Sequence, residues 1–100
     1  MDDFDAEIYD IVRQIPQGKV VTYGQLARLA QRPQWSRKAG RALAHAPAGL
    51  PCHRVVNSCG RLAPAWPAQR DLLEKEGVVF RKNGCVDLSL HLWEEIVPIV

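Results

Sequence analysis

The apolar residues near the start of the chain recur at the spacing of one helix face. The stripe follows i, i+4, i+7, i+8 and i+11 and consists of Phe4, Ile8, Ile11, Val12 and Ile15. Asp2, Asp3 and Asp5 lie near its start, where the helix dipole favours negative charge. Pro16 with Gly18 ends the pattern, so we expect the first helix between these two signals.

Two further helices are predicted before residue 50. After a short extended stretch at residues 20–21, Thr22 and Gln25 have the spacing of a capping box, and the next Arg-Pro pair closes the helix that they begin. Ser36 is a suitable N-cap for a third helix over about residues 37–46. Two short helices joined by a brief turn, behind a longer support helix, have the outline of a helix-turn-helix.

The second half of the chain predicts two small hairpins and one helix. Residues 54–62 have the pattern of strand, turn and strand, which would form a wing. Pro67 suits the first position of a fourth helix that continues to Glu76 and stops at the following glycine. The Asn83-Gly84 pair is typical of a hairpin turn. The predicted fold class is mostly α with small β hairpins, a winged helix-turn-helix domain with a small C-terminal appendage.

The length of 100 residues limits the chain to one small domain, residues 1–100. No apolar run approaches the ~20 residues of a membrane span, and the acidic first residues do not resemble a signal peptide. Three cysteines are too few, and odd in number, for a disulfide framework. We therefore expect a cytoplasmic monomer with reduced thiols and no membrane contact, associated with the nucleoid if the source is bacterial.

Charge is divided unevenly along the chain. Residues 11–70 carry ten basic residues and no carboxylate, whereas residues 1–10 carry five carboxylates and no lysine or arginine. Residues 71–100 are also acidic on balance, so the formal net charge of +2 hides the division. A middle segment without carboxylates suggests that a polyanion, most simply a nucleic-acid backbone, faces it. A solvated basic surface is the alternative.

The third predicted helix has a composition that helix stability alone would not favour. Arg37 and Lys38 stand in its first turn, where the dipole disfavours cations. Gly40 destabilises a helix interior by about 1 kcal/mol relative to alanine. Arg41 shares a face with Arg37, and the alanines between them leave a nearly bare surface. Such a helix suits a DNA groove, with arginines on phosphates or among bases, unless it packs tightly against its own domain.

The Pro-Cys-His-Arg-Val-Val segment that contains Cys52 could carry chemistry. Only a thiolate is a competent nucleophile, and His53, Arg54 and the basic field would favour that form. A histidine can take the thiol proton through a water molecule, and a carboxylate behind it would hold the imidazole in one tautomer. Glu76 is the candidate for that carboxylate. The alternative is that Cys52 is a buried small hydrophobic residue.

Cys59 and Cys85 are interpreted as packing residues. A zinc site that combined them with Cys52 and His53 would lack any paired Cys-x-x-Cys spacing. The sequence therefore predicts no metal site.

Several of these motifs together resemble a known family, the DNA-binding domain of the O6-alkylguanine–DNA alkyltransferases. The motifs are Ile-Pro-x-Gly at 15–18, Thr-Tyr-Gly at 22–24, the arginine that opens the small-residue helix, Pro-Cys-His-Arg-Val-Val at 51–56 and Leu-Leu-x-x-Glu-Gly at 72–77. The resemblance spans roughly residues 4–80. Its Pro-Cys-His-Arg-Val segment is highly specific, and it makes Cys52 an expected acceptor thiol.

The resemblance implies a role for each matching residue. Arg37 would fill the space left by a guanine flipped out through the minor groove, while Tyr23 helps to rotate the nucleotide. Cys52 would attack in line and take the alkyl group from O6, after His53, Glu76 and a water molecule deprotonate it. Tyr23 could also protonate the leaving guanine. The full set of expected DNA contacts is Tyr23, Arg37, Lys38, Gly40, Arg41 and Arg54.

The same resemblance implies the partner and the stoichiometry. The partner would be double-stranded DNA that contains O6-alkylguanine. The thioether formed on the cysteine is stable, so the protein would act once, with neither metal nor cofactor.

Three features depart from the alkyltransferase pattern. The N-terminal domain of longer members is absent from these 100 residues, residues 63–67 (Ala-Pro-Ala-Trp-Pro) replace a Tyr-Ser-Gly-Gly stretch, and Ala46 replaces an asparagine. These features are similar to the alkyltransferase-like proteins, short relatives that bind O6-alkylguanine without repairing it and hand it to nucleotide excision repair proteins. Those relatives, however, mostly have tryptophan at the position of Cys52.

Three functions follow from these observations. We expect alkyl transfer to Cys52, because the Pro-Cys-His-Arg segment and Glu76 keep the activation network. The second function is a non-enzymatic sensor that holds the flipped base and recruits excision repair proteins. The third is a winged-helix regulator that reads sequence, although residues 37–46 offer no asparagine or glutamine to read adenine edges.

Overall fold

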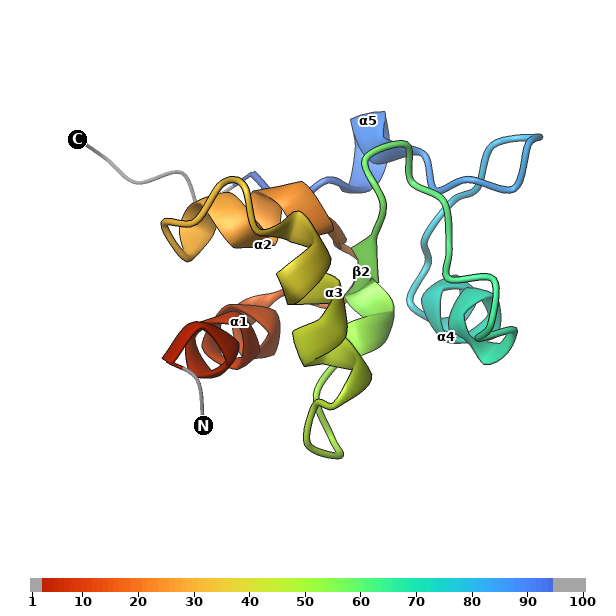
Figure 1. The fold of residues 1–100 in the computed structure, drawn as a ribbon. Coiled ribbons are helices and arrows are strands. Elements are labelled where there is room, and N and C mark those ends of the chain that lie inside the picture. The colour runs from red at the N-terminus through yellow and green to blue at the C-terminus, as the bar shows by residue number, and fades with distance from the viewer. Residues whose placement is uncertain (1–2, 95–100) are drawn as a thin grey trace.

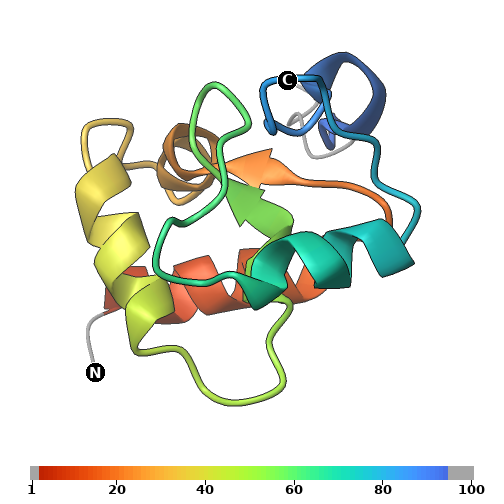
Figure 2. The same ribbon diagram turned by 90° about the vertical axis from the view of Figure 1, so that its right-hand side faces the viewer.

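The computed structural model describes residues 3–94, so residues 1–2, which include Asp2, and residues 95–100 lie outside the described part of the chain. Its elements, in chain order, are α1 (Asp3–Gln14), β1 (Val21–Thr22), α2 (Tyr23–Leu29), α3 (Ser36–Ala44), the 3-10 helix η1 (Cys52–Arg54), β2 (Val55–Val56), α4 (Ala68–Lys75) and α5 (Leu88–His91). Figure 1 shows α1, α2 and α3 on one side of the strands and α4 on the other. Figure 2 shows α4 in front of the strand pair. No helix within residues 3–94 is long and apolar enough to cross a membrane.

The helices α1 to α4 lie where the sequence predicts them, with one exception at the start of α3, whereas η1 and α5 are not predicted. Thr22 accepts a hydrogen bond from the Gln25 N–H (3.0 Å), and the Gln25 side chain accepts one from the Thr22 N–H (3.3 Å), which completes the predicted capping box. The prediction that Ser36 is an N-cap is wrong, because Ser36 is the first residue of α3 and Trp35 occupies the cap position without a side-chain bond. The Trp35 ring packs edge-on against Phe4, with ring centroids 5.1 Å apart. This contact, rather than a hydroxyl cap, anchors the chain where α3 begins.

The strand that follows η1 does not form the predicted hairpin. β2 pairs in parallel with β1, so that Val55 lies opposite Val21. The next residues form a loop, because the Asn57 side chain accepts hydrogen bonds from the N–H groups of Cys59 (2.9 Å) and Arg61 (2.8 Å). A side chain that satisfies two backbone donors in this way replaces the ladder of a second strand. The wing of the predicted fold is therefore a loop.

The residues after α4 belong to the body of the domain and are not an appendage. The predicted turn at residues 83–84 joins a narrow hairpin with one antiparallel bridge, between Phe80 and Val86. Farther on, Leu92 forms a parallel bridge with Val20, and the Trp93 N–H donates to the Val20 carbonyl (2.9 Å). Trp93 is buried in the same apolar cluster as α1. The end of the described chain thus covers the free edge of the first strand.

The core has two parts that meet at the strands. Val21 and Val55 belong to the cluster built with α1, α2 and α3, whereas Val20 and Val56 belong to the cluster with Leu73 of α4. Neighbouring strand residues face opposite sides, so two residues of pairing are enough to join both clusters. This arrangement places η1, which leads directly into β2, between α3 and α4.

Candidate nucleic-acid interface and cysteine site

α3 packs one face against the domain and presents the other to solvent. Ala39 and Ala42 are buried, while Arg37, Lys38 and Arg41 are exposed. The Tyr9 hydroxyl donates to the Ala42 carbonyl (2.8 Å), which fixes α3 to α1. The structure thus combines both sequence interpretations, because the small residues allow close internal packing and the three cations stay outside.

Tyr23 lies between α3 and the cysteine. A β-carbon added to Gly40 would lie 3.9 Å from two carbon atoms of the Tyr23 ring, an ordinary contact distance, so the ring lies beside this part of α3. Burial raises the pKa of Tyr23, and the negative charge of an ionised Cys52 raises it further. The tyrosine hydroxyl is therefore a proton-bearing group in the neighbourhood of the thiol.

Cys52 begins η1 and is half-buried. Burial raises the pKa of its thiol, so Cys52 is protonated at neutral pH. The expectation of a resting thiolate is wrong, and the physical reason is that burial disfavours the charged form of the thiol.

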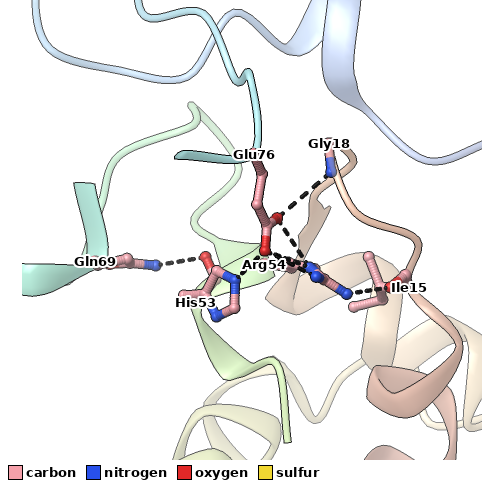
Figure 3. Close-up of polar contacts among 6 residues, drawn as sticks. All are labelled: Ile15, Gly18, His53, Arg54, Gln69 and Glu76. Carbon is pink, nitrogen blue, oxygen red and sulfur yellow. Dashed lines mark hydrogen bonds and ion pairs between the residues drawn. The ribbon is translucent and has the colours of Figure 1, made fainter. Parts of the chain in front are cut away.

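Glu76, which caps the C-terminus of α4, is contacted by three residues from two segments of the chain (Figure 3). His53 Nε2 lies 2.7 Å from Glu76 Oε2, Arg54 contacts both carboxylate oxygens at 2.8 to 3.3 Å, and the Gly18 N–H donates at 3.4 Å. Burial alone would raise the pKa of Glu76, but the hydrogen bonds from Arg54, His53 and Gly18 outweigh it and lower the pKa to about 2. The group is an ionised carboxylate across the physiological range.

Arg54 is a largely buried cation that is bound inside the domain. Its side chain is 17% exposed, and Nη1 donates to the Ile15 carbonyl (2.7 Å) while Nε and Nη2 donate to Glu76. All three nitrogens are thus engaged inside the domain, while the second N–H groups of Nη1 and Nη2 remain free of these bonds, so a DNA contact from Arg54 stays a prediction. It joins the end of α1 to η1 and α4.

The tautomer of His53 follows from its partner. An ionised carboxylate can only accept, so His53 Nε2 carries the hydrogen that faces Glu76. In the neutral ring Nδ1 is then a proton acceptor. The structure brings together His53 and Glu76 as the sequence predicts, in a geometry that can receive a proton from a neighbouring group.

The acidic flanks neutralise part of the basic middle of the chain. Within the described residues, three of its ten cations pair with flanking carboxylates, in the pairs Arg13–Asp10, Arg54–Glu76 and Arg70–Glu74. On α3, Lys38 Nζ lies 3.7 Å from the centre of the Trp35 ring. No ion pair within residues 3–94 joins Arg37, Lys38 or Arg41 to a carboxylate. The cations left uncompensated include those of the exposed face of α3.

Sequence reasoning missed Gln69, which is 1% exposed. Its Nε2 donates to the His53 carbonyl (3.1 Å) and the Val55 carbonyl (3.0 Å), and its Oε1 accepts from the Ala63 N–H (2.8 Å). One signal could have found it, since Gln69 stands four residues before Leu73 and so shares the buried face of that helix.

The loop of residues 61–67 borders a hollow of about 560 Å³. Trp66, 36% exposed, lines it together with Arg61, Arg70 and the hairpin residues 83–85. Trp66 is therefore at the surface and does not pack beneath the loop. Within residues 3–94 no group of three His, Cys, Asp or Glu side chains could hold a metal ion.

Comparison with known proteins gives one consistent family. Residues 3–78 match the family described as "6-O-methylguanine DNA methyltransferase, DNA binding domain". A DNA base-flipping protein of Vibrio parahaemolyticus is 37% identical over 94% of this chain and 99% of its own length. Alkyltransferase-like protein 1 of Schizosaccharomyces pombe is 38% identical, with 94% of each chain covered.

A methylated-DNA–protein-cysteine methyltransferase of Cricetulus griseus is also similar, at 33% identity over 89% of this chain but only 46% of its own length. Among solved structures, S. pombe Atl1 in complex with damaged DNA containing O6-carboxymethylguanine superposes with a TM-score of 0.83. That comparison has 36% identity and covers 94% of this chain and 97% of the other. The relatives matched over nearly their full length are thus a base-flipping protein and an alkyltransferase-like protein.

Proposed function

Because the chain belongs to the 6-O-methylguanine DNA methyltransferase family through its DNA-binding domain, we propose that it binds DNA containing O6-alkylguanine and flips the damaged base out of the duplex. The observation that carries this proposal is the exposed face of α3, where Arg37, Lys38 and Arg41 lie without carboxylate partners in the described chain. The base-flipping and alkyltransferase-like names of the full-length relatives support the same reading. We therefore propose lesion recognition as the first candidate function and alkyl transfer to Cys52 as the second.

The three cations of α3 would have two different roles at the interface. Lys38 and Arg41 would neutralise phosphates, which gives affinity without sequence preference. Arg37, in the first turn of α3, would occupy the gap in the base stack. Flipping costs a few kcal/mol and is easiest for a base that pairs badly, so O6-alkylguanine would be extruded more readily than guanine.

The first test compares two duplexes that differ only in one O6-methyl group. We expect affinity for the O6-methylguanine duplex to exceed that for the guanine duplex by about tenfold or more, because the weakened pair lowers the cost of flipping. Equal affinity would refute lesion recognition and leave the sequence-reading regulator. Selection among undamaged duplexes would then identify the preferred site.

A sensor that leaves the lesion intact needs a second protein to remove it. The resemblance to alkyltransferase-like proteins implies nucleotide excision repair proteins as that partner. The measurement is retention of an excision repair protein on lesion DNA in the presence and absence of this chain, with the guanine duplex as control.

Alkyl transfer to Cys52 is the second candidate, and the His53–Glu76 pair favours it. His53 Nδ1 could take the thiol proton through a water molecule while Glu76 holds the ring. In the transfer, sulfur would form a bond to the alkyl carbon as the carbon–O6 bond breaks, and Tyr23 could supply a proton to the leaving guanine. Because the pKa of Cys52 is raised, this step needs a group that removes the thiol proton.

Mass spectrometry separates the two candidates. After incubation with an O6-methylguanine duplex, a gain of one methylene unit on the Cys52 peptide would establish transfer, whereas an unmodified peptide beside an intact lesion would establish the sensor. Cys52→Ser is the control, because it abolishes transfer while binding persists under either candidate.

A further inference from the structure

Gln69 is the single polar or charged residue in the buried class among residues 3–94. It lies in the first turn of α4, with its side chain directed at the segment that carries the cysteine (Figure 3). A buried amide is costly unless its hydrogen-bonding groups are used. Here both ends of the amide are used, and each holds a different part of the site.

The amide nitrogen binds the backbone of residues 52–55, which we call the cysteine turn. Gln69 Nε2 donates to the carbonyls of His53 (3.1 Å) and Val55 (3.0 Å), the residues that follow Cys52 in η1 and β2. The side chain of His53 is held separately by Glu76, at the other end of the same helix. α4 therefore fixes His53 twice, by its backbone through Gln69 and by its ring through Glu76.

The amide oxygen holds the loop that replaces the family's usual stretch. Gln69 Oε1 accepts from the Ala63 N–H at 2.8 Å. Ala63 opens the segment that continues to Trp66 and lines the surface hollow. One side chain thus sets the distance between this loop and the turn that bears Cys52.

We propose that Gln69 is a positioning residue that locks the cysteine turn and the loop of residues 61–67 in one arrangement, and that this arrangement determines the preference for the damaged base. The proposal rests on the proposed function for its DNA readout. Its effect on the thiol is independent of DNA. Gln69 touches neither the base nor the sulfur, and it acts through the backbone groups that it holds.

Two substitutions separate the two ends of the amide. Gln69→Met has similar length and can neither donate nor accept, so it releases both the turn and the loop. Gln69→Lys keeps a donor for the His53 and Val55 carbonyls but removes the acceptor of the Ala63 N–H. Gln14→Met and Gln14→Lys are matched controls, because Gln14 is exposed on α1 and its side chain donates to the Asp10 carbonyl of its own helix.

The first readout is the rate at which iodoacetamide alkylates Cys52 across a pH series, with no DNA present. In Gln69→Met the released turn admits water to the thiol, so its raised pKa should fall and the rate at pH 7 should rise about fivefold. In Gln69→Lys the turn stays held, and the rate should remain within about threefold of wild type. Thermal unfolding of each variant reports whether it is folded at the assay temperature.

The second readout is the ratio of affinities for the O6-methylguanine and guanine duplexes. Both Gln69 variants lose the loop contact, and we expect the ratio to fall about tenfold in each, because an orphaned buried donor forces the loop to move. Both Gln14 variants should keep the wild-type ratio. A merely structural role would lower the unfolding temperature and leave this ratio and the thiol profile unchanged.

The outcomes are distinct. Folded Gln69→Met and Gln69→Lys with wild-type thiol reactivity and a wild-type affinity ratio would overturn the proposal. If Gln69→Met does not fold, Gln69→Lys decides, and an unchanged ratio in that variant overturns it. If the wild-type chain itself shows no lesion preference, the proposed function fails. The pH series of the thiol then still tests whether Gln69 holds the cysteine turn.

Discussion

Glu76 shows how a single carboxylate can serve both the fold and the site. Its side chain is 11% exposed and receives His53, Arg54 and Gly18, residues that lie far from it along the chain. Removing it would leave the Arg54 guanidinium, 17% exposed, without its counterion. Breaking a buried ion pair from one side costs about 3–5 kcal/mol, so we regard this pair as a structural requirement for the histidine's placement.

Acid should weaken the fold through Glu76 in a defined window. Its pKa is about 2 in the folded chain and returns to its usual value of 4.5 on unfolding, so the unfolded chain takes up the proton first as pH falls. The stabilisation from this group, about 3 kcal/mol, is complete above pH 4.5 and is lost between about pH 4.5 and 2. Urea unfolding over a pH series measures it.

Two variants, one test and one control, show whether Glu76 causes this loss of stability in acid. Glu76→Gln should be less stable at neutral pH and should lack this part of the acid decline. Glu74→Gln removes an exposed carboxylate of the same helix, one that pairs with Arg70, and should keep the decline. An identical decline in Glu76→Gln and wild type would show that another group is responsible.

Replacement of Arg37 should affect lesion preference more than affinity. In Arg37→Ala the flipped base can fall back into the stack, so the ratio of affinities for damaged and undamaged duplex should drop about tenfold or more. Affinity for undamaged duplex should fall only by the loss of one cation. Arg28→Ala, which removes an equally exposed charge from α2, should leave the ratio unchanged. If both variants behave alike, Arg37 has no special place in the gap.

At the scale of elements, α3 is a helix whose intrinsic stability has been reduced in favour of a bare surface. Gly40 weakens its interior, and cations stand in its first turn. Packing compensates, because Ala39 and Ala42 are buried and Tyr9 bonds the α3 backbone. The exposed face is thus free to be shaped by what it contacts.

Gly40→Ala should improve the helix and impair the interface. The added β-carbon would lie 3.9 Å from the Tyr23 ring, an ordinary contact, so stability should rise by about 0.5–1 kcal/mol. Affinity for lesion DNA should fall about fivefold, since a methyl group now separates the helix from the groove. Thermal unfolding and DNA titration of one preparation give both values. Unchanged affinity would mean that α3 does not approach DNA through Gly40.

What the sequence predicts correctly at this scale is local. The capping box of Thr22 and Gln25 and the turn at Asn83-Gly84 are complete within a few residues, so their side chains alone specify them. The parallel partner of Val55 lies more than 30 residues earlier, and local alternation cannot distinguish it from a hairpin neighbour.

The candidate site shows the same limit. The His53–Glu76 pair could be predicted because a family resemblance linked two distant positions. The capture of Arg54 by Glu76 and Ile15 had no such signal, and the local charge pattern suggested a phosphate contact instead. The raised pKa of Cys52 was missed for the same reason, since burial is a property of the assembled elements.

On the scale of the whole molecule, the uneven charge along the chain predicts that the affinity for DNA falls as the salt concentration rises. Each phosphate neutralised by a cation contributes about 0.9 to the slope of log affinity against log salt concentration. Lys38→Ala should therefore reduce the magnitude of that slope by about 0.9. Arg13→Ala should not change it, because Arg13 pairs with Asp10 on α1, 2.7 Å away. Equal slopes for wild type and Lys38→Ala would remove α3 from the phosphate contacts.

The bridge between Leu92 and Val20 has a consequence for how the molecule is made. The first strand emerges from the ribosome early, yet its outer edge and part of the core beneath it wait for Trp93, 73 residues later. A nascent chain therefore cannot fold this domain one element after another from its N-terminus. Contacts between residues so far apart in the sequence also slow the last step of folding. The basic helix and the cysteine turn would become a finished DNA-binding surface only after synthesis has passed Trp93.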